Sequence, residues 1–387
     1  MDTLETPWGP LALARHPERP DDPLRAFDAG DALALAHLHD EGVDRAGQVV
    51  VLADTWGALG AALALRGTGG PVPVVVTDSH RTRRAVAANL ARNDLPADAV
   101  EVRSPLDPLP DRIDVCLVRL PKATDLLDHL LRQARPGLHA GTVVVGAAMA
   151  RHVHRSGLER FEALVGPTRT SRAVRKARLV LPAVDPDLEP GPDPRPRTTA
   201  LGPDGEEVVE HAGVFSAGRL DAGTRLLLAY LPEPGAHRDV VDLGCGNGIV
   251  GLVAARRDPA ARITAVDDST LAAASAAATL ERGLAAGRTV RAVVGDGLRD
   301  LAEGPPLEEA SVDLVLVNPP FHRDHGVGDA TAWQMFTEAR HVLRPGGELR
   351  VVGNRHLAHH AKLSRLFGAS EVLSSDPRYV VVRAERR

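Results

Sequence analysis

The sequence predicts an α/β protein of two tandem doubly wound domains, each built on a mostly parallel sheet. Short valine-rich runs lead into glycine-containing turns and then helix-like stretches of small residues, as in Val49–Gly57 and Val240–Gly248. The same order of segments occurs twice along the chain at nearly constant spacing. A proline-rich stretch separates the two copies. These three observations predict an internal duplication of one domain.

Composition agrees with this fold class and excludes several others. The chain has 387 residues, 44% of them hydrophobic and 25% charged, which suits two ordinary globular domains. The longest apolar stretch, 49–65, contains Asp54, and the first 22 residues lack an apolar core, so neither a membrane span nor a signal peptide is predicted. Two cysteines, Cys116 and Cys245, make no disulfide framework. We expect a cytoplasmic protein without a membrane partner.

The domain division follows from proline content. Seven prolines lie between Pro182 and Pro203, and this density prevents both helix and central-strand hydrogen bonding. The predicted organisation is a first domain over 1–181, a proline-rich linker over 182–207 and a second domain over 208–387. The alternative, a long surface loop within one domain, is less favoured because such loops are uncommon in compact units.

Three further pairs of segments follow the first pair in order. A second predicted strand ends in acid and serine before a helix, a third ends in a polar loop, and a fourth follows an Arg-Pro-Gly turn. The paired segments are 74–79 with 263–269, 113–122 with 312–321, and 135–145 with 344–352. Four segments in the same order are unlike a chance match between unrelated domains.

The two copies are not chemically equal. Ala53 and Thr55 occupy the positions of Gly244 and Gly246, where added side chains keep a ligand away from the backbone. The segment 119–122 is Arg-Leu-Pro-Lys, whereas 318–321 is Asn-Pro-Pro-Phe. The first domain is therefore predicted to be degenerate, and the second to carry the chemistry.

The glycine loop of the second domain is the first candidate site. It follows an apolar strand and opens a helix near Ile249, at the sheet edge where open α/β sheets bind ligands. Its candidate ligand-binding residues are Asp242, Gly244, Gly246, Asn247 and Gly248. Residues 246–251 also fit the G-x-G-x-x-G pattern, so an NAD-dependent oxidoreductase is an alternative.

The acids after successive strands favour a different ligand. A carboxylate at position 242 suits a cationic amine and repels pyrophosphate. Asp267 ends the next strand, where it can accept ribose hydroxyls, and Asp296 follows the third strand, where it can accept from an adenine amine. Capping explains either acid alone, but not three after three strands. S-adenosylmethionine, a nucleoside without phosphate, is the predicted cofactor.

The loop after the strand 312–317 is the second candidate site. Its predicted catalytic residues are Asn318, Pro319, Pro320 and Phe321. The Asn318 amide oxygen and the Pro319 carbonyl can each accept one hydrogen of a nucleobase amine, while Phe321 stacks on a base removed from its stack. His322 and His325 follow without an evident third ligand, so no metal is expected.

With these motifs the chain resembles the tandem-domain guanine-N2 ribosomal RNA methyltransferases of class I fold. The segments that carry the resemblance are 213–216, 220–228, 242–248 and 318–322, and further matches at 166–168, 176–179, 332–336 and 354–357 bring it nearest to the large-subunit members. The resemblance implies methyl transfer from S-adenosylmethionine to guanine N2 in 23S rRNA. It also implies that Phe215 and Asp221 belong to a segment that closes over the cofactor. A 16S rRNA target is the near alternative.

Three rival functions remain open: a protein glutamine methyltransferase, the oxidoreductase above, and a non-catalytic RNA-binding assembly factor. The net charge of −5 means that RNA must be attracted by a local patch. Residues 151–180 hold eight Lys or Arg against two Glu, and Arg81, Arg83 and Arg84 form another cluster. We therefore expect the first domain to dock RNA. The sequence predicts neither the target guanine, nor naked RNA over an assembled particle, nor the oligomeric state.

Overall fold

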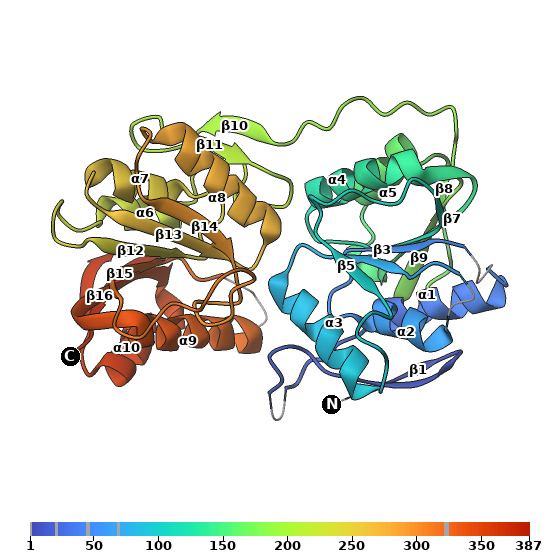
Figure 1. The fold of residues 1–387 in the computed structure, drawn as a ribbon, viewed down its shortest axis with the longest axis horizontal. Coiled ribbons are helices and arrows are strands. Elements are labelled where there is room, and N and C mark those ends of the chain that lie inside the picture. The colour runs from blue at the N-terminus through green and yellow to red at the C-terminus, as the bar shows by residue number, and fades with distance from the viewer. Residues whose placement is uncertain (1, 20–21, 44–46, 68–69, 321–324) are drawn as a thin grey trace. The chain divides into compact units, whose positions relative to one another are not determined.

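The computed structural model describes residues 2–19, 22–43, 47–67, 70–320 and 325–387. The chain divides into two compact units, Met1–Pro194 and Arg195–Arg387, each with its own sheet and helices (Figure 1). Within the predicted linker, residues 183–196 have neither helix nor strand, and Arg197–Ala200 form strand β10 of the second unit. The domain boundaries at 181 and 208 stay predictions.

The first unit is a seven-stranded sheet in the order β5-β4-β3-β6-β7-β9-β8, parallel except for β9, which runs antiparallel to both neighbours. Strands β1 and β2 form a separate hairpin. The strands are β1 (Asp2–Thr6), β2 (Gly9–Leu13), β3 (Val49–Leu52), β4 (Val74–Val76), β5 (Glu101–Arg103), β6 (Ile113–Arg119), β7 (Leu138–Met149), β8 (Thr168–Thr170) and β9 (Ala177–Pro182). The helices are α1 (Ala29–Asp40), α2 (Ala58–Arg66), α3 (His80–Arg92), α4 (Thr124–Ala134) and α5 (Arg155–Leu164), with 3-10 turns at 135–137 and 150–152.

The second unit has a seven-stranded sheet in the order β14-β13-β12-β15-β16-β18-β17, in which only β18 runs antiparallel. Strands β10 and β11 form a separate antiparallel pair. Its strands are β10, β11 (Glu207–Glu210), β12 (Asp239–Leu243), β13 (Arg262–Asp267), β14 (Val290–Val294), β15 (Val312–Val317), β16 (Leu343–Asn354), β17 (Glu371–Ser375) and β18 (Tyr379–Glu385). Its helices are α6 (Ala222–Ala229), α7 (Ile249–Arg257), α8 (Thr270–Gly283), α9 (His325–Val342) and α10 (His359–Phe367), with a 3-10 turn at 355–357.

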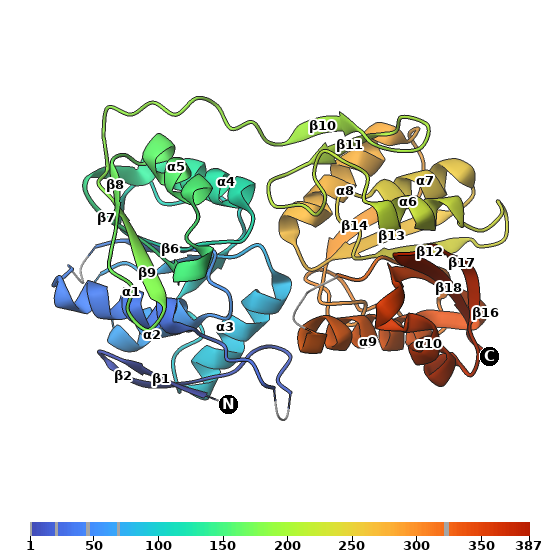
Figure 2. The ribbon, with the colours of Figure 1, turned by 180° about the vertical axis from the view of Figure 1, so that it is seen from behind.

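The two sheets have the same strand order once β3 is matched with β12 and the rest follow in sequence. Helices cover both faces of each sheet (Figures 1 and 2). In the first unit α1, α2 and α3 share one face and α4 and α5 the other; in the second, α6 to α8 share one face and α9 and α10 the other. The predicted fold class, two tandem doubly wound α/β domains, is confirmed.

Local sequence explains why matching elements form at matching places. The central strands are buried on both faces, which suits their valine-rich composition. Helices α3 and α8 each begin after a serine whose hydroxyl accepts a backbone hydrogen bond from the third residue beyond it: Ser79 from Thr82, and Ser269 from Ala272. Helices α2 and α7 instead begin after Gly57 and Gly248, at φ 78° and 80°.

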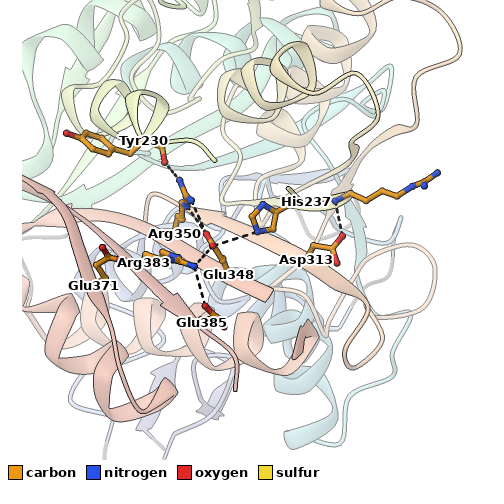
Figure 3. A network of polar contacts seen from close by, with 9 residues as sticks. Tyr230, His237, Asp313, Glu348, Arg350, Glu371, Arg383 and Glu385 are labelled. Carbon is orange, nitrogen blue, oxygen red and sulfur yellow. Dashed lines mark hydrogen bonds and ion pairs between the residues drawn. The ribbon is translucent and has the colours of Figure 1, made fainter. Parts of the chain in front are cut away.

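A polar network joins the amino-terminal half of β16 to the carboxyl-terminal end of β18 (Figure 3). The largely buried Glu348 carboxylate lies 2.6 Å from Arg383 Nη2 and 3.0 Å from Arg350 Nη2, and Arg350 also donates to the Tyr230 carbonyl. His237 lies 4.0 Å away, and burial lowers the pKa of its imidazole. Because buried charges must be paired, this network stabilises one end of the sheet. That end lies opposite the loops that follow the carboxyl ends of the parallel strands. Among the described residues, no helix is long and apolar enough to cross a membrane.

Candidate active site

Polar loops follow the carboxyl ends of four neighbouring strands in the second sheet. Because β14, β13, β12 and β15 are adjacent and parallel, the loops after them line one edge. Asp296 follows β14, Asp267 ends β13, the glycine loop follows β12, and Asn318 follows β15. The structure therefore brings these predicted site residues to one edge of the sheet.

The three glycines of the loop after β12 share a left-handed backbone, and Gly246 and Gly248 differ in what surrounds them. All have positive φ, at 77° for Gly244, 54° for Gly246 and 80° for Gly248. A Cβ on Gly248 would lie 2.8 Å from the Ala276 backbone, so this glycine permits α7 and α8 to pack closely. A Cβ on Gly246 would meet no atom of the described residues within 4 Å. Gly246 therefore leaves open space above the backbone, as a bound ligand requires.

Asp242 anchors the start of helix α7. Its side chain is 3% exposed, and its Oδ2 accepts a hydrogen bond from the Gly251 backbone N–H at 2.9 Å. Burial raises the pKa of its carboxyl to about 7, although the Gly251 bond opposes the shift. The sequence predicted a contact with a ligand amine. In the structure this carboxyl is buried and hydrogen-bonded to the first turn of α7, and the contact with a ligand stays a prediction.

Asp267 ties the glycine loop to the next strand. Its Oδ2 accepts from the Gly246 backbone N–H at 3.0 Å, and its Oδ1 accepts from Ser269 at 3.0 Å. Burial raises the pKa of its carboxyl. A carboxylate is thereby fixed beside the open space at Gly246, where it can receive hydroxyl donors.

Asp296 is held by helix α9, a contact that sequence reasoning missed. The Gln334 amide nitrogen lies 3.3 Å from Asp296 Oδ1 and 3.1 Å from Glu338 Oε1. Glu338 accepts from the Leu298 backbone N–H at 2.6 Å, and burial raises the pKa of its carboxyl. The signal was present as two polar residues spaced i, i+4, which share one helix face. Together they fix the loop that carries Asp296.

Asn318 directly follows β15, and its two amide atoms lie in different surroundings. Its Nδ2 lies 2.9 Å from Thr224 Oγ1 and 3.4 Å from Asp221 Oδ2, in the first turn of α6. Its Oδ1 is buried and has no hydrogen-bond partner among the residues described. Pro319 is buried and Pro320 exposed, whereas Phe321 and His322 lie outside the described residues.

Glu210 is a further residue that sequence reasoning missed. It is fully buried, and both its oxygens accept from the Gly218 backbone N–H at 2.9 Å. The Asn247 amide lies 3.3 Å from it and Arg197 lies 3.1 Å away. Glu210 thus connects the glycine loop with the segment 211–221, on which Phe215 is 62% exposed. Its signal was the alternation in Glu-Val-Val-Glu, which puts Glu210 on the same face as Val208, where a buried charge must be paired.

The first unit has the same frame with different side chains. Ala53 stands at φ 60° where Gly244 stands in the second unit. Arg119 is the last residue of β6, at the place where Asn318 follows β15, and it forms ion pairs with Asp28 and Asp31 at the start of α1. A cavity of about 580 Å³ lies at this edge, and Arg119, Lys122 and Arg151 are among its lining residues. No group of three or more His, Cys, Asp or Glu residues is placed to hold a metal, within the chain as described.

Comparison with known proteins gives matches over both units. Residues 1–186 match the RLMG N-terminal domain family, and residues 205–383 match the Methyltransferase small domain family. The protein named Ribosomal RNA large subunit methyltransferase G is 50% identical in Streptomyces coelicolor, over 98% of this chain and 99% of that protein. Its counterpart in Stutzerimonas stutzeri is 43% identical over 99% of both.

A solved structure resembles the whole chain. It is the T. thermophilus 16S rRNA N2 G1207 methyltransferase (RsmC), in complex with AdoMet and guanosine. The two chains are 25% identical with a TM-score of 0.73, over 100% of this chain and 98% of the other. The similarity therefore extends to the tandem arrangement of both α/β units along the chain.

Proposed function

The chain belongs to the ribosomal RNA large subunit methyltransferase G family, and we infer that it transfers a methyl group from S-adenosylmethionine to N2 of a guanine in 23S rRNA. The large-subunit names of the full-length relatives favour 23S rRNA over the 16S alternative. The guanine N2 position is supported by the solved relative, which is named as an N2 methyltransferase of a guanine in 16S rRNA.

The observation that carries the proposal is the unpartnered amide oxygen of Asn318. A guanine amino group is a weak nucleophile because its lone pair is delocalised into the ring. When Asn318 Oδ1 and the Pro319 carbonyl each accept one of its hydrogens, the amine becomes more pyramidal and its lone pair is directed outward. These residues therefore orient and activate the amine, and Phe321 stacks on the base.

The residues at the sheet edge fit S-adenosylmethionine. The open space at Gly246 accommodates a ligand against the backbone, with Gly244, Asn247 and Gly248 shaping the loop. Asp267 and Asp296 accept from the ribose and the adenine amine, while Phe215 and Asp221 close the site and Asp242 sets the loop from below. When bound, the sulfonium supplies an electrophilic methyl carbon.

The first domain is the proposed RNA-docking unit. The turn between β8 and β9 carries Arg172, Arg175 and Lys176, all exposed. The Ala150 backbone N–H donates to the Lys176 carbonyl at 2.7 Å, so this turn adjoins Arg151 at the cavity of the first unit. We call these basic residues at the edge of the cavity, Arg151, Arg172, Arg175 and Lys176, the rim. The rim attracts the phosphates of RNA without distinguishing one base sequence from another.

Pairing reduces the basic cluster that the sequence predicted in this domain. Arg160 lies 3.2 Å from Asp128, and Arg155 lies 2.9 Å from Glu159. The proposed phosphate-binding surface is therefore the rim rather than all eight basic residues. Because rRNA is a cytoplasmic polymer and both cysteines are free, we assign the protein to the cytoplasm.

The test is labelled methyl transfer to separated 16S and 23S RNA, offered naked and as ribosomal particles, with mapping of the modified base. We expect N2-methylguanine in 23S rRNA. Asn318→Ala is expected to lower kcat at least a hundredfold while the S-adenosylmethionine Kd stays within about twofold. Full turnover in Asn318→Ala, or a product other than N2-methylguanine, would contradict the proposal.

A further inference from the structure

The two ends of the Asn318 amide are not interchangeable. The oxygen accepts hydrogen bonds, whereas the nitrogen only donates them. An amino group offers hydrogens, so only Oδ1 can serve it. The catalytic competence of Asn318 in the proposed function therefore depends on which way its amide is turned.

Helix α6 supplies the groups that decide this. Asp221 caps the helix by accepting from the Thr224 backbone N–H at 3.1 Å, and its carboxylate has no hydrogen to donate. With Asn318 reversed, its oxygen would face this carboxylate with no proton between them. In the observed orientation, Asn318 Nδ2 lies 2.9 Å from the Thr224 hydroxyl and 3.4 Å from Asp221 Oδ2. Its Oδ1 then has no hydrogen-bond partner among the described residues and can accept from a substrate.

We propose that Asp221 and Thr224 are positioning residues for the Asn318 amide. The Asp221 carboxylate only accepts and therefore sets the orientation with the amide oxygen toward the substrate amine, and the Thr224 hydroxyl anchors the amide nitrogen in that orientation. This inference rests on the proposed function of Asn318. Thr224 is 6% exposed, so no bulk water is at hand to replace its hydroxyl. The two residues act through Asn318 and need no contact of their own with the guanine.

The first domain provides independent support. Segment 27–30 is Phe-Asp-Ala-Gly and segment 220–223 is Leu-Asp-Ala-Gly, so Asp28 corresponds to Asp221. Asp31 then corresponds to Thr224, and Arg119 to Asn318. The contact between this helix turn and this strand end persists in both domains, with Arg119 Nε 2.9 Å from Asp31.

The exchange of side chains in the first domain is a matched set. Arginine has only donors, so Arg119 cannot accept a hydrogen from an amine. Its partner in the first domain is the Asp31 carboxylate, where the second domain has the Thr224 hydroxyl, and the carboxylate balances the arginine charge. In each domain the residue in the helix turn is therefore a suitable hydrogen-bond or ion-pair partner for the residue after the strand. This is expected if the helix turn orients that residue.

The experiment compares kcat and KM for wild type, Thr224→Val and Thr224→Ser on the RNA form that wild type methylates. Thr224→Val keeps the side-chain shape but removes the acceptor, and we expect kcat to fall about tenfold with both KM values unchanged. Thr224→Ser restores the hydroxyl and is expected to recover most of kcat. A merely structural role would not produce this rescue with constant KM.

The matched control is Thr142→Val in the first domain. Thr142 is 7% exposed, and its hydroxyl donates to the Ile113 carbonyl and accepts from His139. We expect Thr142→Val to lose about as much thermal stability as Thr224→Val but to keep the wild-type kcat. Asp221→Asn is the second variant: asparagine caps a helix as well as aspartate but can donate, so it permits the reversed amide and kcat is again expected to fall.

The outcomes separate this inference from the proposed function. If Asn318→Ala is inactive but Thr224→Val and Asp221→Asn both retain wild-type kcat, the positioning role is refuted and the role of Asn318 stands. If Asn318→Ala retains activity, the proposed function of Asn318 fails first. A tenfold loss in Thr224→Val that serine does not rescue also overturns the positioning role.

Discussion

Gly246→Ala is the substitution that most directly tests the ligand cradle. The backbone at this position has φ 54°, a left-handed conformation that costs an L-alanine about 1 kcal/mol relative to glycine. The added methyl would enter the open space above the loop, because no described atom lies within 4 Å of it. We expect two separable effects, a small loss of stability and a large loss of S-adenosylmethionine binding.

Gly42→Ala is the matched control. Gly42 has φ 59° and likewise has no described atom within 4 Å of its Cβ position, but it lies at the end of α1 in the first unit. Both variants should lower the melting temperature of their own unit by about 2–4 °C. Only Gly246→Ala should weaken S-adenosylmethionine binding, by at least about tenfold in Kd, because a methyl group occupies the space of the ligand.

Calorimetric titration with S-adenosylmethionine and thermal unfolding, run on the same preparations, separate the two effects. If Gly246→Ala binds the ligand as tightly as wild type while losing the expected stability, the ligand does not lie over this glycine. If Gly42→Ala loses binding to the same extent, the effect is strain and not occupancy.

Two more predictions concern charge. Asp242 has its pKa raised to about 7 from 3.8, so the folded protein binds its proton more tightly than the unfolded chain, and the stability from this group is present below about pH 4 and is lost as pH rises to about 7. Between pH 5 and 6 the unfolding free energy of wild type should fall by about 1 kcal/mol relative to that of Asp242→Asn, with a shallower fall as pH approaches 7. If the denaturant-derived unfolding free energies of the two proteins run parallel with pH, the prediction is refuted. Reversing the charges of Arg172, Arg175 and Lys176 together should weaken rRNA binding at least about tenfold at 0.1 M salt and make it less salt-dependent, with S-adenosylmethionine Kd as the internal control. Unchanged RNA affinity would remove the β8–β9 turn from the interface.

The fold was predictable because its signals are local and repeated. Valine-rich strands, glycine turns and serine caps each depend on a few neighbouring residues, and the duplication presents each of them twice. The strand order β14-β13-β12-β15 could then be expected from the doubly wound class, which places Asp267, Asp296 and Asn318 at one edge.

The side-chain contacts that complete the site were not predictable in the same way. Asn318 and Asp221 are 97 residues apart, and Asn247 and Glu210 are 37 apart. Hydrogen bonds across such separations depend on the relative placement of packed elements, which no local pattern encodes. The match between Asp28 and Asp221 was present in the sequence, but its meaning emerged only when both were found against the strand end.

Ala53 has a left-handed backbone in the first unit, although alanine tolerates this conformation poorly. Thr55, two residues on, stands where the second unit has Gly246. The crossover from strand to helix thus imposes the same backbone bend in both units, whatever side chains the turn carries. The bend is therefore a property of the shared fold, and the two units differ in the side chains that the bend carries. A search for S-adenosylmethionine sites that compares backbone shape alone will therefore score the turn of the first unit and the glycine loop of the second unit alike.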